Sequence, residues 1–107
     1  MVPYRLLYVT VANEASGRDL ARRLVEKRLA ACVHLLPPGR SFYWWKDELV
    51  ESGEMALLAK TRADLAQTAI DTIAQWHDYD CPCVLSLPIE EGYPPFLRWI
   101  SEETQAG

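Results

Sequence analysis

A histidine and two cysteines lie close together in the C-terminal third of the chain. His77, Cys81 and Cys83 follow the spacing His-x-x-x-Cys-x-Cys. Imidazole and thiolate groups are ligands for copper, zinc and related soft or borderline ions. Asp78 and Asp80 offer oxygen ligands from the same segment. The spacing therefore predicts a metal site at His77, Cys81 and Cys83.

A structural interpretation of the same residue types stays open. Unpaired cysteines are commonly buried as small apolar side chains, and a loop histidine often makes a structural hydrogen bond. Cys-x-Cys is also a weaker metal signal than Cys-x-x-Cys. Cys32 lies in an apolar segment, so we expect it in the core. We expect His34 on the opposite face of that segment, as a hydrogen-bonded interface histidine.

Two basic residues, Lys60 and Arg62, end a predicted strand directly before a predicted helix. A helix N-terminus presents free N–H groups, so this pair is a candidate site for an anionic effector. A glycine-rich phosphate loop does not accompany them, which favours the alternative of solvated or ion-paired side chains. No constellation of nucleophile and base stands out, and we expect no enzymatic activity.

Composition limits the class of protein. The chain has 107 residues, of which 50% are hydrophobic and 24% charged, as in one folded domain over residues 1–107. The net charge of −4 without a basic block disfavours nucleic acid as a partner. No apolar run reaches the ~18 residues of a membrane span. Three cysteines and no signal-peptide pattern predict a reducing compartment, the cytoplasm.

Hydrophobic periodicity predicts how these residues are positioned. Runs of β-branched and aromatic residues predict strands, whether they alternate with polar residues or are continuous. Apolar residues at helical spacing predict helices. We expect Ser16 to cap the first helix and Asp47 to take a left-handed turn conformation. The predicted strands are residues 4–11, 31–36, 41–45, 49–61 and 84–89, and the predicted helices are residues 18–29, 64–76 and 94–100. The order β-α-β-β-α-β plus a short C-terminal helix predicts an α+β, ferredoxin-like split βαβ sandwich with an antiparallel sheet.

Four consecutive aromatic residues, Phe42, Tyr43, Trp44 and Trp45, lie in one predicted strand. Neighbouring strand residues point to opposite faces, and the helices cover only one face of the sheet. Each ring offers about 150–250 Å² of surface, so leaving them in water would expose a large apolar patch. We therefore expect these four residues to form an interface between copies of the chain. In the alternative, the terminal helix and loops cover the second face.

Several ordered segments make the chain similar to the CutA family of divalent-cation tolerance proteins. They are LVEKRLAACVHLLPPGRSFYWWKDELVESGE from Leu24, LLAKT from Leu57, His77 with Tyr79, and LPIEEGYPPFLRWI from Leu87. The resemblance implies a cytoplasmic homotrimer with contacts through sheet edges and the hairpin at residues 41–49. It also implies a role in tolerance of divalent metal ions, with Cu²⁺ as the first candidate ligand.

The chain departs from the family pattern at four positions. His34 replaces a usual asparagine, Asp47 a usual glycine, and Cys83 a usual glutamate, and Val9 stands where some members have a cysteine linked to copper. The family's metal site is therefore not transferable intact. Two other functions remain open: a structural or partner-docking trimer, and a small-molecule effector trimer with Lys60 and Arg62 at clefts between subunits.

Overall fold

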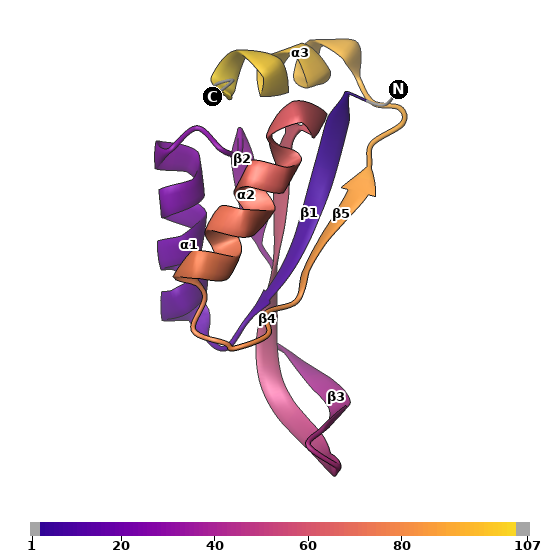
Figure 1. The fold of residues 1–107 in the computed structure, drawn as a ribbon. Helices are drawn as coiled ribbons and strands as arrows, with labels where there is room; N and C mark the ends of the chain where they lie inside the picture. Colours follow the sequence, from indigo (N-terminus) through magenta and orange to yellow (C-terminus); the bar gives the residue numbers. More distant parts are fainter. Residues whose placement is uncertain (1–2, 105–107) are drawn as a thin grey trace.

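An antiparallel sheet backed by two helices forms the body of the protein (Figure 1). The structure is a computed structural model that describes residues 3–104. Its elements, in chain order, are β1 (Tyr4–Val11), α1 (Glu14–Glu26), β2 (Cys32–Leu35), β3 (Gly39–Trp45), β4 (Glu48–Arg62), α2 (Ala63–Trp76), β5 (Val84–Pro88) and α3 (Pro94–Glu103).

The sheet has the strand order β2-β4-β1-β5, and every pairing in it is antiparallel. β1 and β4 lie at the centre of this order, where a split βαβ unit has its first and third strands when β2 and β3 are counted as one. The predicted ferredoxin-like fold is therefore confirmed. β2 and β3 are two pieces of one edge. Both pair with β4, and Pro37 and Pro38 interrupt them because proline has no N–H to donate. Leu36 N–H keeps the edge attached by donating to Ala56 O at 2.9 Å.

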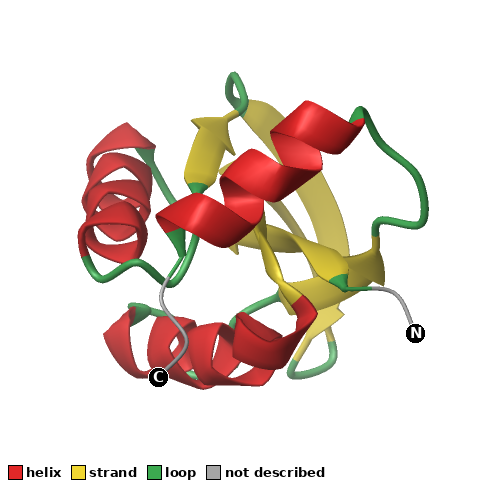
Figure 2. Cartoon of the chain, turned by 90° about the horizontal axis from the view of Figure 1, so that it is seen from above, coloured by secondary structure: helices red, strands yellow, loops and turns green. Residues whose placement is uncertain are grey.

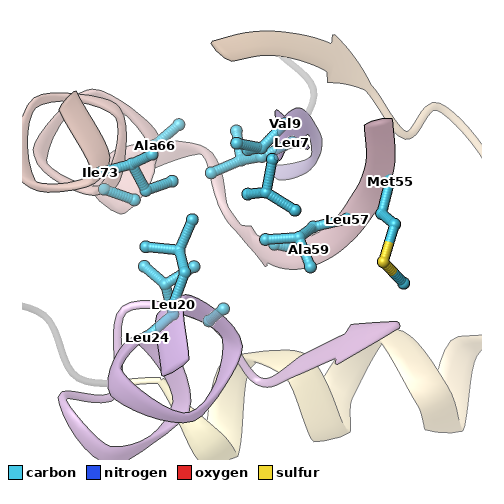
Figure 3. Close-up of a cluster of buried hydrophobic side chains, with 12 residues drawn as sticks. Leu7, Val9, Leu20, Leu24, Met55, Leu57, Ala59, Ala66 and Ile73 are labelled. Carbon is cyan, nitrogen blue, oxygen red and sulfur yellow. The ribbon is translucent and has the colours of Figure 1, made fainter. Parts of the chain in front are cut away.

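The core lies between the sheet and the helices α1 and α2 (Figure 3). Every second residue is buried from Leu7 to Val11 in β1 and from Met55 to Thr61 in β4, as the strand period requires. The helices supply Leu20 and Leu24 from α1, and Ala66 and Ile73 from α2. The strand residues that meet them are Leu7, Val9, Leu57 and Ala59.

The first helix begins earlier than predicted. Asn13 has an extended backbone, and its side-chain Oδ1 accepts the Ser16 N–H at 2.9 Å. Asn13 is therefore the N-cap, and the predicted cap at Ser16 is wrong. Gly17 lets this helix lie close to the sheet, because a Cβ there would come within 2.9 Å of Leu35 Cδ1 and 3.1 Å of Val11 Cγ2.

A long β-hairpin projects beyond the body (Figure 1). β4 has 15 residues: its second half lies in the central sheet, and its first half pairs only with β3. Lys46 and Asp47 form the two-residue turn with φ of 49° and 66°, as a type I′ turn requires. The predicted left-handed Asp47 is confirmed. The hairpin contributes to overall dimensions of 45 × 25 × 23 Å.

α3 lies across the end of the sheet where β1 begins and β4 ends (Figures 1 and 2). Tyr4 Oη and Ser101 Oγ, 2.7 Å apart, share a hydrogen bond, and Arg28 pairs with Glu103 at 3.0 Å. None of the helices in residues 3–104 is long and apolar enough to span a membrane.

The sheet face turned away from α1 and α2, called here the open face, has two rows of side chains. Each row crosses β5, β1, β4 and β2 in that order. One row consists of Leu85, Tyr8, Leu58 and His34, and the other of Leu87, Leu6, Lys60 and Cys32. Leu85 and Leu87 are exposed. Cys32 and His34 share this face because two positions separate them, so their predicted placement on opposite faces is wrong. Cys32 is half-buried rather than a core residue.

Candidate functional site

The loop between α2 and β5 lies beside the base of the hairpin and bounds a groove of about 560 Å³. This groove is called the thiol groove because Cys81 and Cys83 both line it. Its volume falls within the ~300–1,000 Å³ of small-ligand sites. The other lining residues are Thr10, Ala12, Tyr43, Trp45, Ser52, Gly53, Glu54, Tyr79 and Asp80.

Hydrogen bonds to both ring nitrogens fix the position of His77. The Tyr79 N–H donates to Nδ1 at 3.1 Å, so Nδ1 is the acceptor. Nε2 therefore holds the proton and donates it to Thr10 O at 2.7 Å. A metal ion at either nitrogen would replace one of these bonds. In this arrangement His77 ties the end of α2 to the end of β1, which is the structural interpretation of this residue.

Tyr79 and Glu54 form the polar contact across the thiol groove. The Tyr79 hydroxyl donates to Glu54 Oε2 at 2.8 Å. Burial, and then the hydrogen bond to Glu54, raise the pKa of Tyr79 from 10.0 to about 12. Tyr79 therefore stays a neutral donor at physiological pH and holds the Glu54 carboxylate at the groove wall. The tilted ring of His77 packs against Tyr79 with a centroid separation of 4.6 Å.

The two cysteines of the predicted site share the thiol groove, but His77 does not line it. Both thiols are free; Cys81 is exposed and Cys83 is half-buried. Asp80 lines the groove with them, whereas Asp78 accepts a hydrogen bond from Ser16 Oγ at 3.2 Å. Within residues 3–104, no group of three or more His, Cys, Asp or Glu side chains is arranged to hold a metal ion. Of the three predicted metal residues, the two cysteines line the groove and His77 does not.

Strand alternation places Lys60 and Arg62, the predicted anion-binding pair, on one face of β4 and Thr61 on the other. Thr61 points into the core and donates to Leu29 O at 2.7 Å. Lys60 and Arg62 lie on the other face, where Arg62 Nε pairs with Asp64 Oδ1 at 3.1 Å. Asp64 thus places its own carboxylate in the first turn of α2, the position where an external anion would bind.

The aromatic residues of β3 divide between the two faces of the hairpin, as strand alternation predicts. Phe42 and Trp44 are 67% and 70% exposed, while Tyr43 and Trp45, which line the thiol groove, are 40% and 46% exposed. Leu49 lies directly opposite Trp44 in the ladder. Within residues 3–104, Phe42 and Trp44 stay largely exposed, whereas Tyr43 and Trp45 share the groove with the loop between α2 and β5.

Sequence reasoning missed Glu54 and Thr10 as parts of this site. Glu54 is one of several glutamates in a strand, and the Thr10 contact uses a backbone carbonyl, which the residue type does not report. The family-like His-x-Tyr pair was the available signal, because both of its side chains make the contacts that hold the loop. Together the fold and the groove define a class: a small ferredoxin-like α+β domain with a projecting hairpin and a thiol-lined groove at its base.

The sequence profile of the CutA1 divalent ion tolerance protein family matches residues 5–103. The chain therefore belongs to the CutA family. It is 38% identical over 99 residues to the protein CutA of Mus musculus and 42% identical over 95 residues to the CutA homolog of Xenopus laevis. These matches cover 92% and 89% of the chain, but only 56% and 63% of the relatives' own length.

A solved relative has the same fold over its whole length. The crystal structure of CutA1 from Oryza sativa superposes with a TM-score of 0.95 at 36% identity. The match covers 99% of this chain and 97% of the rice chain. The interrupted β2–β3 edge and the long β4 therefore belong to a fold found in a solved member of the family.

Proposed function

We propose that this chain assembles with copies of itself into a homotrimer that acts in tolerance of divalent metal ions by binding them. We also propose that it is not an enzyme and that it works in the cytoplasm, where its free thiols stay reduced. The observation that carries the proposal is the pair of apolar surfaces that the single chain leaves uncovered: the hairpin aromatics and the open face.

Self-association is supported by the size of these surfaces. Trp44 and Leu49, opposite each other in the ladder, are 70% and 67% exposed. Monomeric proteins seldom expose contiguous apolar patches larger than about 300–600 Å². Phe42 and Trp44 leave two largely exposed rings on one face of the hairpin, and Leu85 and Leu87 add exposed apolar surface on the open face. Copies related by closed symmetry would bury both surfaces with one kind of contact.

Metal binding is supported by the donor groups at the thiol groove. Cys81 and Cys83 supply sulfur, and Glu54 and Asp80 supply carboxylate oxygens nearby. No Lys or Arg side chain lines the groove, so a cation meets negative charge without competition from fixed cations. The sulfur donors suit copper and zinc better than magnesium or calcium, and Cu²⁺ is the first divalent ion to test.

The experiment measures mass and metal content together. Protein purified without an affinity tag is examined by light scattering and by equilibrium dialysis against Cu(II) and Zn(II). We expect about three times the 12.2 kDa of one chain, and saturable binding above a protein-free blank. A stable 12.2 kDa particle in dilute solution contradicts the assembly, and binding equal to the blank contradicts the metal role.

A further inference from the structure

Aromatic rings form part of the wall of the thiol groove. Tyr43 and Trp45 lie on the same face of the hairpin, and both rings line the groove while they stay 40% and 46% exposed. Tyr79 adds a third ring from the loop between α2 and β5. The face of an aromatic ring carries partial negative charge, so it attracts a cation that lies within about 6 Å of the ring centre. The lining therefore favours a positively charged ligand.

Two carboxylates give the same groove negative charge. Glu54 lies on β4, on the hairpin face that carries Tyr43 and Trp45. The Tyr79 hydroxyl donates to its Oε2 at 2.8 Å and holds the carboxylate at the groove. Asp80 adds a second carboxylate, which is exposed. Among the ion pairs of residues 3–104, none joins either carboxylate to a Lys or Arg side chain, so both charges are available to a ligand.

The basic side chains of the hairpin lie away from the groove. Arg40 lies on the opposite face of β3 from Tyr43, where its Nε pairs with Glu51 Oε2 at 3.0 Å. Lys46 lies in the turn at the hairpin tip. The described part of the chain contributes no Lys or Arg to the groove lining. The groove is therefore complementary in charge to a cation.

The size of the groove indicates which class of cation fits it. A volume of about 560 Å³ is far larger than a single ion needs and suits a small organic molecule. A hard inorganic ion gives up its water reluctantly, and aromatic rings do not replace that water. An ammonium ion with alkyl substituents carries its charge inside an apolar surface, which packs against ring faces. Rings, carboxylates and volume together match an alkylammonium ion.

We propose that the thiol groove binds a small organic cation of the alkylammonium class, between the rings of Tyr43, Trp45 and Tyr79 and the carboxylates of Glu54 and Asp80. The charged nitrogen lies against the ring faces, and no covalent bond forms or breaks. This site goes beyond the proposed function and does not rest on it, because it requires neither a metal ion nor a thiol. The exposed rings on the other face of the hairpin stay available for assembly.

The test is an NMR titration of the full, assembled chain with tetramethylammonium chloride, in EDTA and at constant ionic strength. We expect saturable shifts at the Trp45 indole N–H and at the backbone amides of residues 79–81. Uncharged tert-butanol, of similar size, should bind at least about fivefold more weakly, because it loses both the ring and the carboxylate attraction. Equal affinity for the two probes, or no saturable shift with tetramethylammonium, overturns the inference. Because EDTA removes divalent ions, the result is independent of the proposed metal role.

A charge substitution tests the carboxylate. Glu54→Gln keeps an acceptor for Tyr79 and removes the charge, so affinity for tetramethylammonium should fall about fivefold, the upper end for an exposed ion pair. Glu51→Gln is the matched control, because it makes the same charge change in the same strand on the opposite face. Its affinity should stay within about twofold of wild type, since screening weakens the effect of an exposed charge on the other face.

A ring substitution tests the aromatic wall. Trp45→Leu should lower the affinity by about 2- to 30-fold, the range of cation–π attraction, and Trp45→Phe, which keeps a weaker ring, should fall between Trp45→Leu and wild type. Trp99→Leu is the control, since this partly exposed tryptophan lies in α3, at the other end of the molecule from the hairpin (Figure 1). Wild-type affinity in both Glu54→Gln and Trp45→Leu overturns the inference. If Trp45→Leu does not fold, Trp45→Phe and the comparison of the two probes on wild type decide.

Discussion

Replacing Trp44 by alanine tests whether the hairpin is an assembly surface. Trp44 is 70% exposed, and an aromatic side chain offers about 150–250 Å², so roughly 100–175 Å² is available for burial. At ~25 cal/mol per Å² this area is worth about 3–4 kcal/mol per subunit as an upper limit. Such a loss corresponds to a roughly 100- to 1,000-fold weaker association at each contact.

Sedimentation equilibrium over a dilution series measures this change. We expect Trp44→Ala to dissociate at concentrations where the wild type keeps its full mass, with an unchanged circular dichroism spectrum, because the ring packs against no core residue. Val25→Ala is the control, since Val25 is an exposed apolar residue of α1, away from the hairpin and the open face. Equal masses of Trp44→Ala and wild type at every dilution would refute the assignment of the hairpin as an interface.

Three further substitutions test the contacts that position the site, each read from urea unfolding. Tyr79→Phe should destabilise the chain by about 1 kcal/mol at pH 8. Because the folded pKa of Tyr79 is raised from 10.0 to about 12, the wild type should lose this advantage as pH rises through that window. Gly17→Ala should cost about 1–3 kcal/mol, because its Cβ crowds Leu35. Thr61→Val should cost about 1–3 kcal/mol, since Leu29 O loses its donor inside the protein.

Each of these three variants has a matched control substitution. Tyr43→Phe removes an exposed hydroxyl bond to Ser52 and should change stability little at any pH. Arg18→Ala alters the same helix as Gly17→Ala without entering the core. Thr61→Ser keeps the hydroxyl and should recover part of the loss. A Tyr79→Phe profile parallel to the wild type between pH 10 and 12 would contradict the assigned role of the phenol.

Much of the fold follows from local pattern. The strand predicted at residues 4–11 has the bounds of β1, because this segment is rich in β-branched and aromatic residues and contains no breaker. The start of α1 was wrong because Asn13 and Ser16 are both good capping residues, and the choice depends on which one has extended backbone. The predicted strands leave residues 46–48 for the hairpin turn, but the turn contains only Lys46 and Asp47, so Trp45 pairs with Glu48.

The site was less predictable, because its bonds join residues distant in sequence. The two cysteines are close in sequence, and both line the groove. The partner of His77 is the Thr10 carbonyl, 67 positions away, and the partner of Tyr79 is Glu54, 25 positions away. Neither partner has a sequence signature. The separation of His77 from the two thiols therefore follows only from the folded arrangement.

The continuity of β4 limits how the length of this protein can change. One uninterrupted strand serves both the central sheet and the hairpin, and its side chains alternate without a break from Glu48 to Arg62. A single residue inserted near Gly53 would leave the central sheet unchanged but would move every side chain of the hairpin to the opposite face. Tyr43 and Trp45 would then point where Phe42 and Trp44 point now, and the reverse. Natural or engineered insertions should therefore be accepted at the tip, or as matched pairs in β3 and β4, and rejected as single residues at the base.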